Sequence, residues 1–231
     1  MQLSHSLRIY CQFFENAKKQ KFYNAWCDLE QVEISNGLIL RNHPSKETRR
    51  FLNFLQDRVR CFQALFPYNL FLSPEMKEGQ RLCNICGKDD NPWSDCEHIP
   101  GQIYCGVLCV REIRDVTFLG AAITTNPVQK YSVLNVEKVE SEKNSQKYAI
   151  VRSIVDLLDD PFESWNFQWT KRRHPHQFFS HIDGSEQCPC GSGHTYRDCC
   201  LSENGVLRPH IDFIFHERDQ VPMSFRYVGY K

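Results

Sequence analysis

The run CPCGSGHTYRDCC at residues 188–200 places four thiols in one short segment, as a CxC pair, eight residues and a CC pair. So short a segment cannot hold one shape by burying apolar surface alone. Zinc in proteins takes about four ligands in a tetrahedral arrangement, and glycines beside the cysteines allow the tight turns that bring such ligands together. The spacing therefore predicts one metal ion bound by Cys188, Cys190, Cys199 and Cys200.

The residues between the two cysteine pairs suit this role. Pro189 restricts the backbone inside the first pair, whereas Gly191 and Gly193 can adopt positive φ and turn their N–H groups toward the sulfurs. A metal held by four thiolates is negatively charged. His194 and Arg197 lie close enough in the sequence to offset part of that charge.

This run resembles the SEC-C motif, the metal-binding element at the C-terminus of the bacterial translocation motor SecA, which also occurs in YecA-like proteins. The resemblance covers CPCGSG, the region of Tyr196 and the CC pair. At His194 and Thr195 the family usually carries lysines, so the basic character that helps it to meet acidic partners is weaker here. The phosphate-binding pattern GxxxxGK[ST] does not occur, so the ATPase activity of the motor is not carried over.

The SEC-C resemblance implies a metal-stabilised docking element for a protein partner, such as a SecB-like chaperone or the ribosome. It implies zinc as the usual metal, with iron as the alternative at this C-terminal site. If function is carried over together with form, the partner docks on exposed side chains of the loop between the cysteine pairs. These side chains are His194, Tyr196 and Arg197.

A second group of cysteines lies at residues 83–109, in CNICGKDDNPWSDCEHIPGQIYCGVLC. It begins with a CxxC pair followed by glycine, which is typical of a zinc knuckle, and a CxH pair follows after one short loop. Cys105 and Cys109 compete for the same role, but we interpret them as buried residues at the start of an amphipathic helix. The predicted ligands of a second zinc ion are Cys83, Cys86, Cys96 and His98.

The same segment has a second resemblance, because CEHIPG after a CxxC pair is similar to the start of an HNH nuclease site. In that ββα-metal fold a histidine activates water, which implies His98 as the general base. The helix expected next, VLCVREIRDV, offers no second histidine or asparagine to complete a divalent-metal site. The run HIPGQIYCG, followed by DVTFLGAAITTNPV, is also similar to zinc-bearing segments of some phage-associated proteins. A nucleic-acid-binding protein or degenerate nuclease is therefore the alternative function, and we expect no catalytic residues.

Composition limits the class of protein. Of 231 residues, 41% are hydrophobic, enough to bury a core, and 28 basic residues balance 28 acidic ones, so net charge favours neither nucleic acid nor a membrane surface. The sequence has no apolar run of membrane-spanning length, and its first residues lack the uninterrupted apolar stretch of a signal peptide, so we expect neither a membrane span nor a signal peptide. Twelve cysteines grouped in pairs favour metal binding in a reducing compartment over disulfides. We therefore expect a cytoplasmic protein.

Hydrophobic periodicity predicts an α+β fold. Helices are expected over residues 4–20, from Ser45 as N-cap to Phe66, and over 149–159. The first should bury Leu7, Tyr10, Cys11 and Phe14, the second Phe51, Leu55, Val59, Phe62 and Phe66, and the third Ile150, Val151, Ile154, Val155 and Leu158.

Strands are expected where apolar residues alternate. Residues 32–41 predict a β-hairpin, because Asn36 and Gly37 suit a type I′ turn and the flanking apolar residues alternate onto one face. Trp165, Phe167 and Trp169 alternate before the C-terminal cysteines, and Ile211, Phe213 and Phe215 alternate after them. Cations beside these tryptophans could meet nucleic acid, but we favour a packing role.

The chain is expected to consist of small zinc-stabilised domains. Residues 1–80 form a helical region with a hairpin, and residues 81–134 form a zinc-knuckle domain. Residues 135–160 contain a polar linker and a short helix. Residues 161–231 form the C-terminal region, in which the SEC-C element is followed by short strands.

Overall fold

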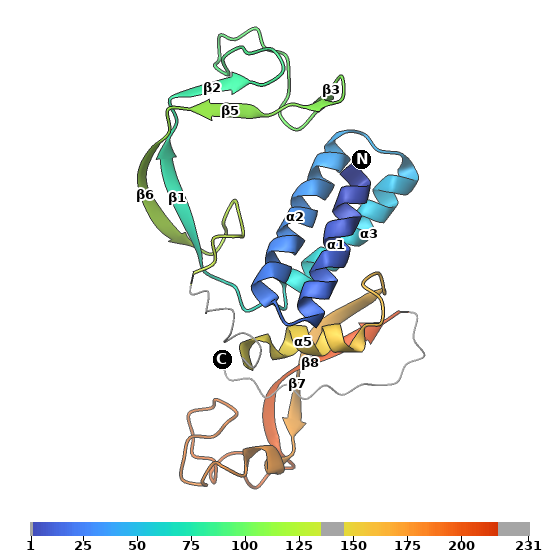
Figure 1. Ribbon diagram of the computed structural model, residues 1–231. Helices are drawn as coiled ribbons and strands as arrows, with labels where there is room; N and C mark the ends of the chain where they lie inside the picture. Colours follow the sequence, from blue (N-terminus) through green and yellow to red (C-terminus); the bar gives the residue numbers. More distant parts are fainter. Residues whose placement is uncertain (1, 135–145, 217–231) are drawn as a thin grey trace. The chain divides into compact units, whose positions relative to one another are not determined.

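A computed structural model describes residues 2–134 and 146–216. They form two compact units, Met1–Phe162 and Glu163–Lys231. Helices and short antiparallel strands are both present, so the predicted α+β class is confirmed (Figure 1). Among the described helices, none is both long enough and apolar enough to cross a lipid bilayer.

The N-terminal unit contains the helices. They are α1 (Gln2–Lys18), α2 (Phe22–Arg41), α3 (Lys46–Gln63) and α5 (Ala149–Leu157), the last preceded by the 3-10 turn η1 (Gln146–Tyr148). Helix α2 contacts both α1 and α3, and α5 contacts α1. Aromatic and leucine side chains fill this core, among them Tyr10, Phe13, Phe22, Leu29, Leu52, Leu55 and Phe62.

The predicted hairpin over residues 32–41 was wrong, because these residues form the second half of α2. Val32, Asn36 and Ile39 recur at helical spacing and are buried on one face, whereas Ile34 is 42% exposed. Asn36 accepts a hydrogen bond from Ser6 on α1. A tertiary contact therefore overrides the local turn preference of Asn36-Gly37.

The three helices predicted from periodicity are present, although Leu7 on α1 and Phe51 on α3 are only half-buried and one residue of the predicted faces is exposed. Ser45 caps α3 as expected, since its Oγ accepts the Thr48 N–H at 3.2 Å. On α1, Tyr10 and Phe14 are buried but Cys11 is exposed, because the buried face runs through Phe13 instead. The predicted apolar face of α5 is buried.

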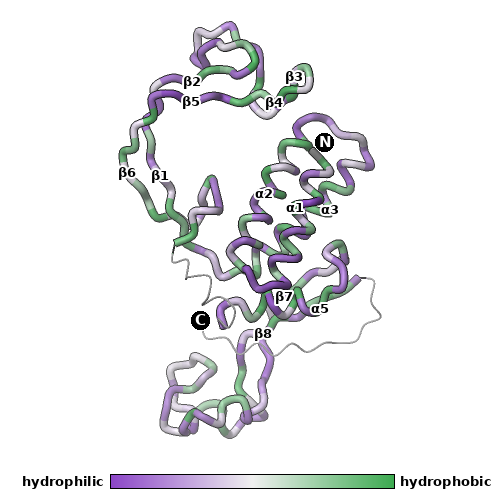
Figure 2. Tube along the Cα trace, in the orientation of Figure 1, coloured by the Kyte–Doolittle hydropathy of each residue, from purple (hydrophilic) through white to green (hydrophobic). Residues whose placement is uncertain are grey.

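Three short antiparallel pairs follow α3. They are β1 (Phe71–Lys77) with β6 (Thr117–Thr124), β2 (Gln80–Cys83) with β5 (Arg111–Arg114), and β3 (Ile103–Tyr104) with β4 (Val107–Leu108). Figure 2 shows apolar residues along β6, where Phe118 and Ile123 are 65% and 68% exposed. The β2–β5 pair brackets residues 84–110, which carry most of the second cysteine group.

A partly buried ion pair attaches the segment around Lys130 to α2. Trp26 Nε1 donates to the Lys130 carbonyl at 2.6 Å, and the Lys130 N–H donates to Glu30 Oε1 at 3.1 Å. The Lys130 ammonium contacts Glu33 and lies 3.8 Å from Glu30 Oε2. Burial raises the pKa of the Glu30 carboxyl, although Lys130 acts in the opposite direction.

The C-terminal unit is one long hairpin with an insertion. Strands β7 (Trp165–His174) and β8 (Val206–Phe215) pair without a break from Trp165↔Phe215 to His174↔Val206. The strands predicted on both sides of the C-terminal cysteines are therefore present. Residues 175–205, including the 3-10 turn η2 (His176–Phe179), connect the two paired ends and contain the cysteine run.

Candidate metal centres

The four cysteines of the C-terminal run converge on one point. The Sγ atoms of Cys190 and Cys199 are 3.6 Å apart, and those of Cys199 and Cys200 are 3.8 Å apart. All four sulfurs of the predicted set lie within 4.8 Å of one another. A tetrahedral ion with Zn–S bonds of about 2.3 Å separates its sulfurs by about 3.8 Å, so this arrangement fits a tetrahedral metal.

Tight turns bring the two cysteine pairs together. The Gly191 N–H donates to the Cys188 carbonyl at 3.0 Å, and the Cys188 N–H donates to the His194 carbonyl at 2.8 Å. Gly191 and Gly193 have φ values of 79° and 82°, in the left-handed region that glycine adopts without strain. The chain therefore reverses after the first pair, as the positions of the glycines predicted.

A buried tyrosine connects the cysteine run to the rest of the insertion. Tyr196 is 2% exposed, and its hydroxyl lies 2.6 Å from His176 Nδ1. The other ring nitrogen of His176 lies 2.8 Å from the Glu203 carbonyl. The prediction that Tyr196 is an exposed docking residue was wrong, since it packs with Phe179, Cys188, Cys200 and Val206. His194 and Arg197 are exposed as expected.

The protonation of these thiols differs because their surroundings differ. Burial raises the pKa of Cys188 to about 12. Burial also acts on Cys190, but hydrogen bonds from Ser192 and from neighbouring thiols lower its pKa to about 6. Metal binding requires thiolates, so the remaining protons must be released when an ion binds.

Cations from the hairpin border this cluster, which the sequence alone did not indicate. Lys171, Arg173 and Arg208 line a cavity of about 500 Å³ together with Cys190 and Cys199. Arg208 donates to the Pro189 carbonyl, inside the CxC pair. These positive charges offset the charge of a thiolate-bound ion. The KRR run at 171–173 was recognisable as basic, but its proximity to the cysteines depends on the fold.

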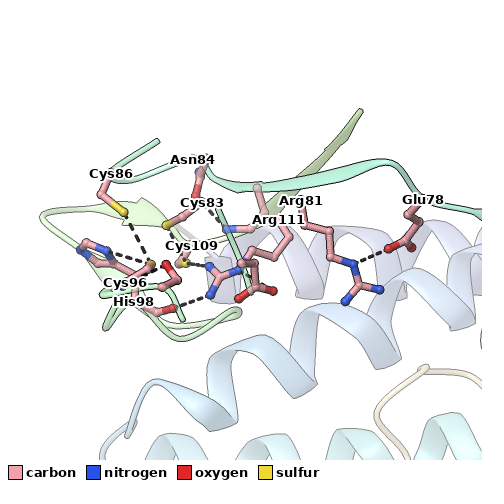
Figure 3. A network of polar contacts seen from close by, with 12 residues as sticks. Glu78, Arg81, Cys83, Asn84, Cys86, Cys96, His98, Cys109 and Arg111 are labelled. Atoms are coloured by element: carbon pink, nitrogen blue, oxygen red, sulfur yellow. Dashed lines mark hydrogen bonds and ion pairs between the residues drawn. The ribbon is translucent and has the colours of Figure 1, made fainter. Parts of the chain in front are cut away.

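The second cluster is built around the end of β2. The Gly87 N–H donates to the Cys83 carbonyl at 2.7 Å with a Gly87 φ of 72°, which forms the expected knuckle turn. Cys86 and Cys96 Sγ are 3.5 Å apart, and Cys96 Sγ is 3.8 Å from His98 Nδ1 (Figure 3). The four predicted ligands, Cys83, Cys86, Cys96 and His98, lie within 4.8 Å of one another.

The two competing cysteines are not in a helix, so that prediction was wrong. Residues 103–114 form β3, β4 and β5, and Cys105 and Gly106 make the turn between β3 and β4 with φ values of 50° and 83°. Cys105 is exposed, whereas Cys109 is buried, and its Sγ lies 3.9 Å from Cys83 Sγ. Because strands follow His98, the ββα arrangement of an HNH site is not formed by these residues.

The surroundings of the second cluster are open and polar. Cys86, Cys96 and His98 border a cavity of about 280 Å³ with Lys88 and Asp95, among others. Burial acts on Cys83, but backbone hydrogen bonds from Cys86 and Ile85 lower its pKa to about 6. Each cluster therefore contains one thiol that ionises near neutral pH, where a first metal–sulfur bond can form.

The disulfide state agrees with metal binding. All twelve cysteines lie in described residues, and none forms a disulfide. Two groups of ligand-bearing side chains could each hold a metal ion, one in each unit.

Comparison with known proteins assigns a family motif to the C-terminal cluster. No curated protein and no solved structure matches the chain. Residues 185–202 match the family model described as the SEC-C motif. The matched residues include both cysteine pairs and the turn between them. The chain therefore carries a SEC-C motif, whose four cysteines converge at the end of the β7–β8 hairpin.

Proposed function

We propose that this protein is a zinc-stabilised interaction adaptor of the bacterial cytoplasm, which docks a protein partner through its SEC-C element. The observation that carries the proposal is the convergence of four sulfurs within 4.8 Å inside the matched motif. Thiolates with imidazole are the ligands that structural zinc sites use, and a reducing compartment keeps such cysteines available. Iron is the alternative at the C-terminal centre.

The metal acts in this proposal as a structural support. In the C-terminal centre Cys188, Cys190, Cys199 and Cys200 fill all four positions of a tetrahedral ion, which leaves none for a substrate. The second centre has the same role with its predicted set. The proposal assigns no catalytic residue to either one.

Docking is supported by the charges displayed around the C-terminal centre. Arg197 and His194 are exposed on the loop, and Lys171, Arg173 and Arg208 border the neighbouring cavity. Such a surface favours an acidic protein surface, and a SecB-like chaperone or a ribosomal protein is the class of partner that the SEC-C resemblance implies.

The test is a pull-down from the native host with wild type, Arg197→Glu and the matched control Arg49→Glu, an exposed arginine on α3. We expect Arg197→Glu to capture no partner, although its zinc content and its fold are the same as those of wild type. Arg49→Glu should capture as wild type does. Full capture by Arg197→Glu would place recognition elsewhere and would contradict the proposal.

Nucleic acid is the second candidate partner, and one observation favours it. Trp169 on β7 is 51% exposed and is followed in the same strand by the exposed cations Lys171, Arg172 and Arg173. An aromatic side chain beside cations can stack on an unpaired base and contact phosphates. Salt-sensitive binding of single-stranded nucleic acid that Trp169→Ala abolishes would support this candidate over the adaptor.

A further inference from the structure

The sulfur of Cys109 lies beside the predicted ligands of the second cluster, although it is not one of them. Cys109 is fully buried, and its Sγ is 3.9 Å from Cys83 Sγ. Two sulfurs bound to one tetrahedral zinc are separated by about 3.8 Å. Cys109 and Cys83 are therefore spaced as two ligands of the same ion.

One guanidinium connects Cys109 with the alternative ligand His98. Arg111 Nη1 donates to Cys109 Sγ at 3.2 Å, and Arg111 Nη2 donates to the His98 carbonyl at 2.8 Å (Figure 3). Arg111 Nε is also 3.1 Å from an Asp90 oxygen, and the Arg111 side chain is only 13% exposed. A largely buried guanidinium that donates to a sulfur is the type of outer contact that orients metal ligands and balances their charge.

His98 and Cys109 approach the cluster from different surroundings. His98 is half-buried and borders the open cavity of about 280 Å³. Cys109 is buried and does not line that cavity. His98 is thus a nitrogen donor on the open side of the cluster, and Cys109 is a sulfur donor on its buried side. A tetrahedral ion that is already bound by three other thiols has one position left, so only one of these two donors can bind at a time.

We propose that the second centre has five donors, of which Cys83, Cys86 and Cys96 are constant and the fourth position is shared by His98 and Cys109. The ion is bound by three thiolates and one imidazole when His98 is coordinated, and by four thiolates when Cys109 replaces it. Arg111 positions both donors. This inference rests on the proposed zinc content of the second centre.

The experiment measures zinc per chain and cobalt-substituted spectra for wild type, His98→Ala, Cys109→Ala and the double variant. The matched control is Cys105→Ala, an exposed cysteine of the neighbouring turn. We expect every single variant to keep both ions, and the double variant to keep about one, at the C-terminal centre. His98→Ala should increase the thiolate-to-cobalt absorption, since a fourth sulfur replaces nitrogen.

The outcomes separate this inference from the proposed function. Loss of one ion in either single variant, or retention of both in the double variant, would overturn the shared position. Fewer than two ions in the wild type would instead refute the two-centre proposal on which it rests.

Arg111→Met tests the positioning role of Arg111. It should accelerate zinc loss to a chelator far more in the His98→Ala background than in wild type. Equal acceleration in both backgrounds would show that Arg111 is only structural.

Discussion

The Ser6 hydroxyl on α1 donates a hydrogen bond to Asn36 Oδ1 on α2 at 2.8 Å, and both side chains are fully buried. The Asn36 Nδ2 group has no hydrogen-bond partner among the described residues. This buried pair therefore helps to fix the rotation of the two helices about their axes, together with the hydrogen bonds that Gln12 and Asn16 on α1 donate to Asp28 on α2. Removal of Ser6 would leave the buried amide without any partner.

The first prediction concerns this pair. Ser6→Ala should lower the free energy of unfolding by about 1–3 kcal/mol, because a buried amide loses its only side-chain partner. Ser6→Ala combined with Asn36→Leu should recover most of the loss, since no polar group then remains unpaired. Urea unfolding of the three variants measures both values. A larger loss in the double variant would contradict this explanation.

The second prediction concerns metal content. Wild type should bind one zinc ion in each of the two clusters, and Cys199→Ser should lose the C-terminal ion. The insertion between β7 and β8 should then lose its order, while far-ultraviolet circular dichroism keeps the signal of α1, α2 and α3, whose core is apolar. Cys11→Ser, an exposed thiol on α1, serves as the control and should keep both ions. Elemental analysis that finds about one ion or none in wild type refutes the prediction.

The third prediction concerns the Tyr196 hydroxyl. Tyr196→Phe removes the contact of the hydroxyl with His176 Nδ1. The loss of this hydrogen bond should lower the stability of the folded insertion by about 0.5–1.5 kcal/mol. Because order in this insertion is coupled to metal binding, zinc affinity at the C-terminal centre should fall by a few-fold to about tenfold. Chelator competition measures the change. Unchanged affinity would mean that the buried tyrosine contributes nothing to the centre.

The fourth prediction concerns pH. Burial raises the pKa of Glu30 above its ordinary value of 4.5, so the folded protein binds a proton at this carboxyl more tightly than the unfolded chain does. The stability that this proton contributes is fully present at pH values below the ordinary pKa of Glu30. It is lost as the pH rises through the pKa that Glu30 has in the folded state. Glu30→Gln should therefore flatten the pH dependence of the urea midpoint above pH 4.5, whereas the exposed control Glu15→Gln should leave it unchanged. Parallel profiles for wild type and Glu30→Gln would exclude this assignment.

The fifth prediction concerns nuclease activity. His98 Nδ1 faces Cys96 Sγ at 3.8 Å, and strands rather than a helix follow it, so we expect no partner group for general-base chemistry. Purified protein with magnesium should cleave DNA no faster than His98→Ala does. Magnesium-dependent cleavage that His98→Ala abolishes while zinc remains bound would reveal a nuclease site.

Sequence reasoning located both cysteine groups because their geometry is mainly local. Glycine at φ > 0 beside a CxC or CxxC pair determines where the sulfurs point, and Ser45 caps α3 through a contact three residues away. The Asn36-Gly37 turn was predicted incorrectly because the contact that decides its conformation is with Ser6, on another helix. Lys171 and Arg208 were missed as neighbours of the cysteines, since only the β7–β8 register brings them there.

The arrangement of β7 and β8 has a consequence for how the SEC-C element can be inherited. His174 and Val206 are register partners, so the chain enters and leaves residues 175–205 at the same end of one ladder. A segment with adjacent ends can be transplanted into a surface hairpin of another protein, or exchanged for a short turn, without altering the strands that carry it. The element can thus be moved as one segment, and its recipient needs two paired strands that also supply the contacts made here by Val206 and Arg208.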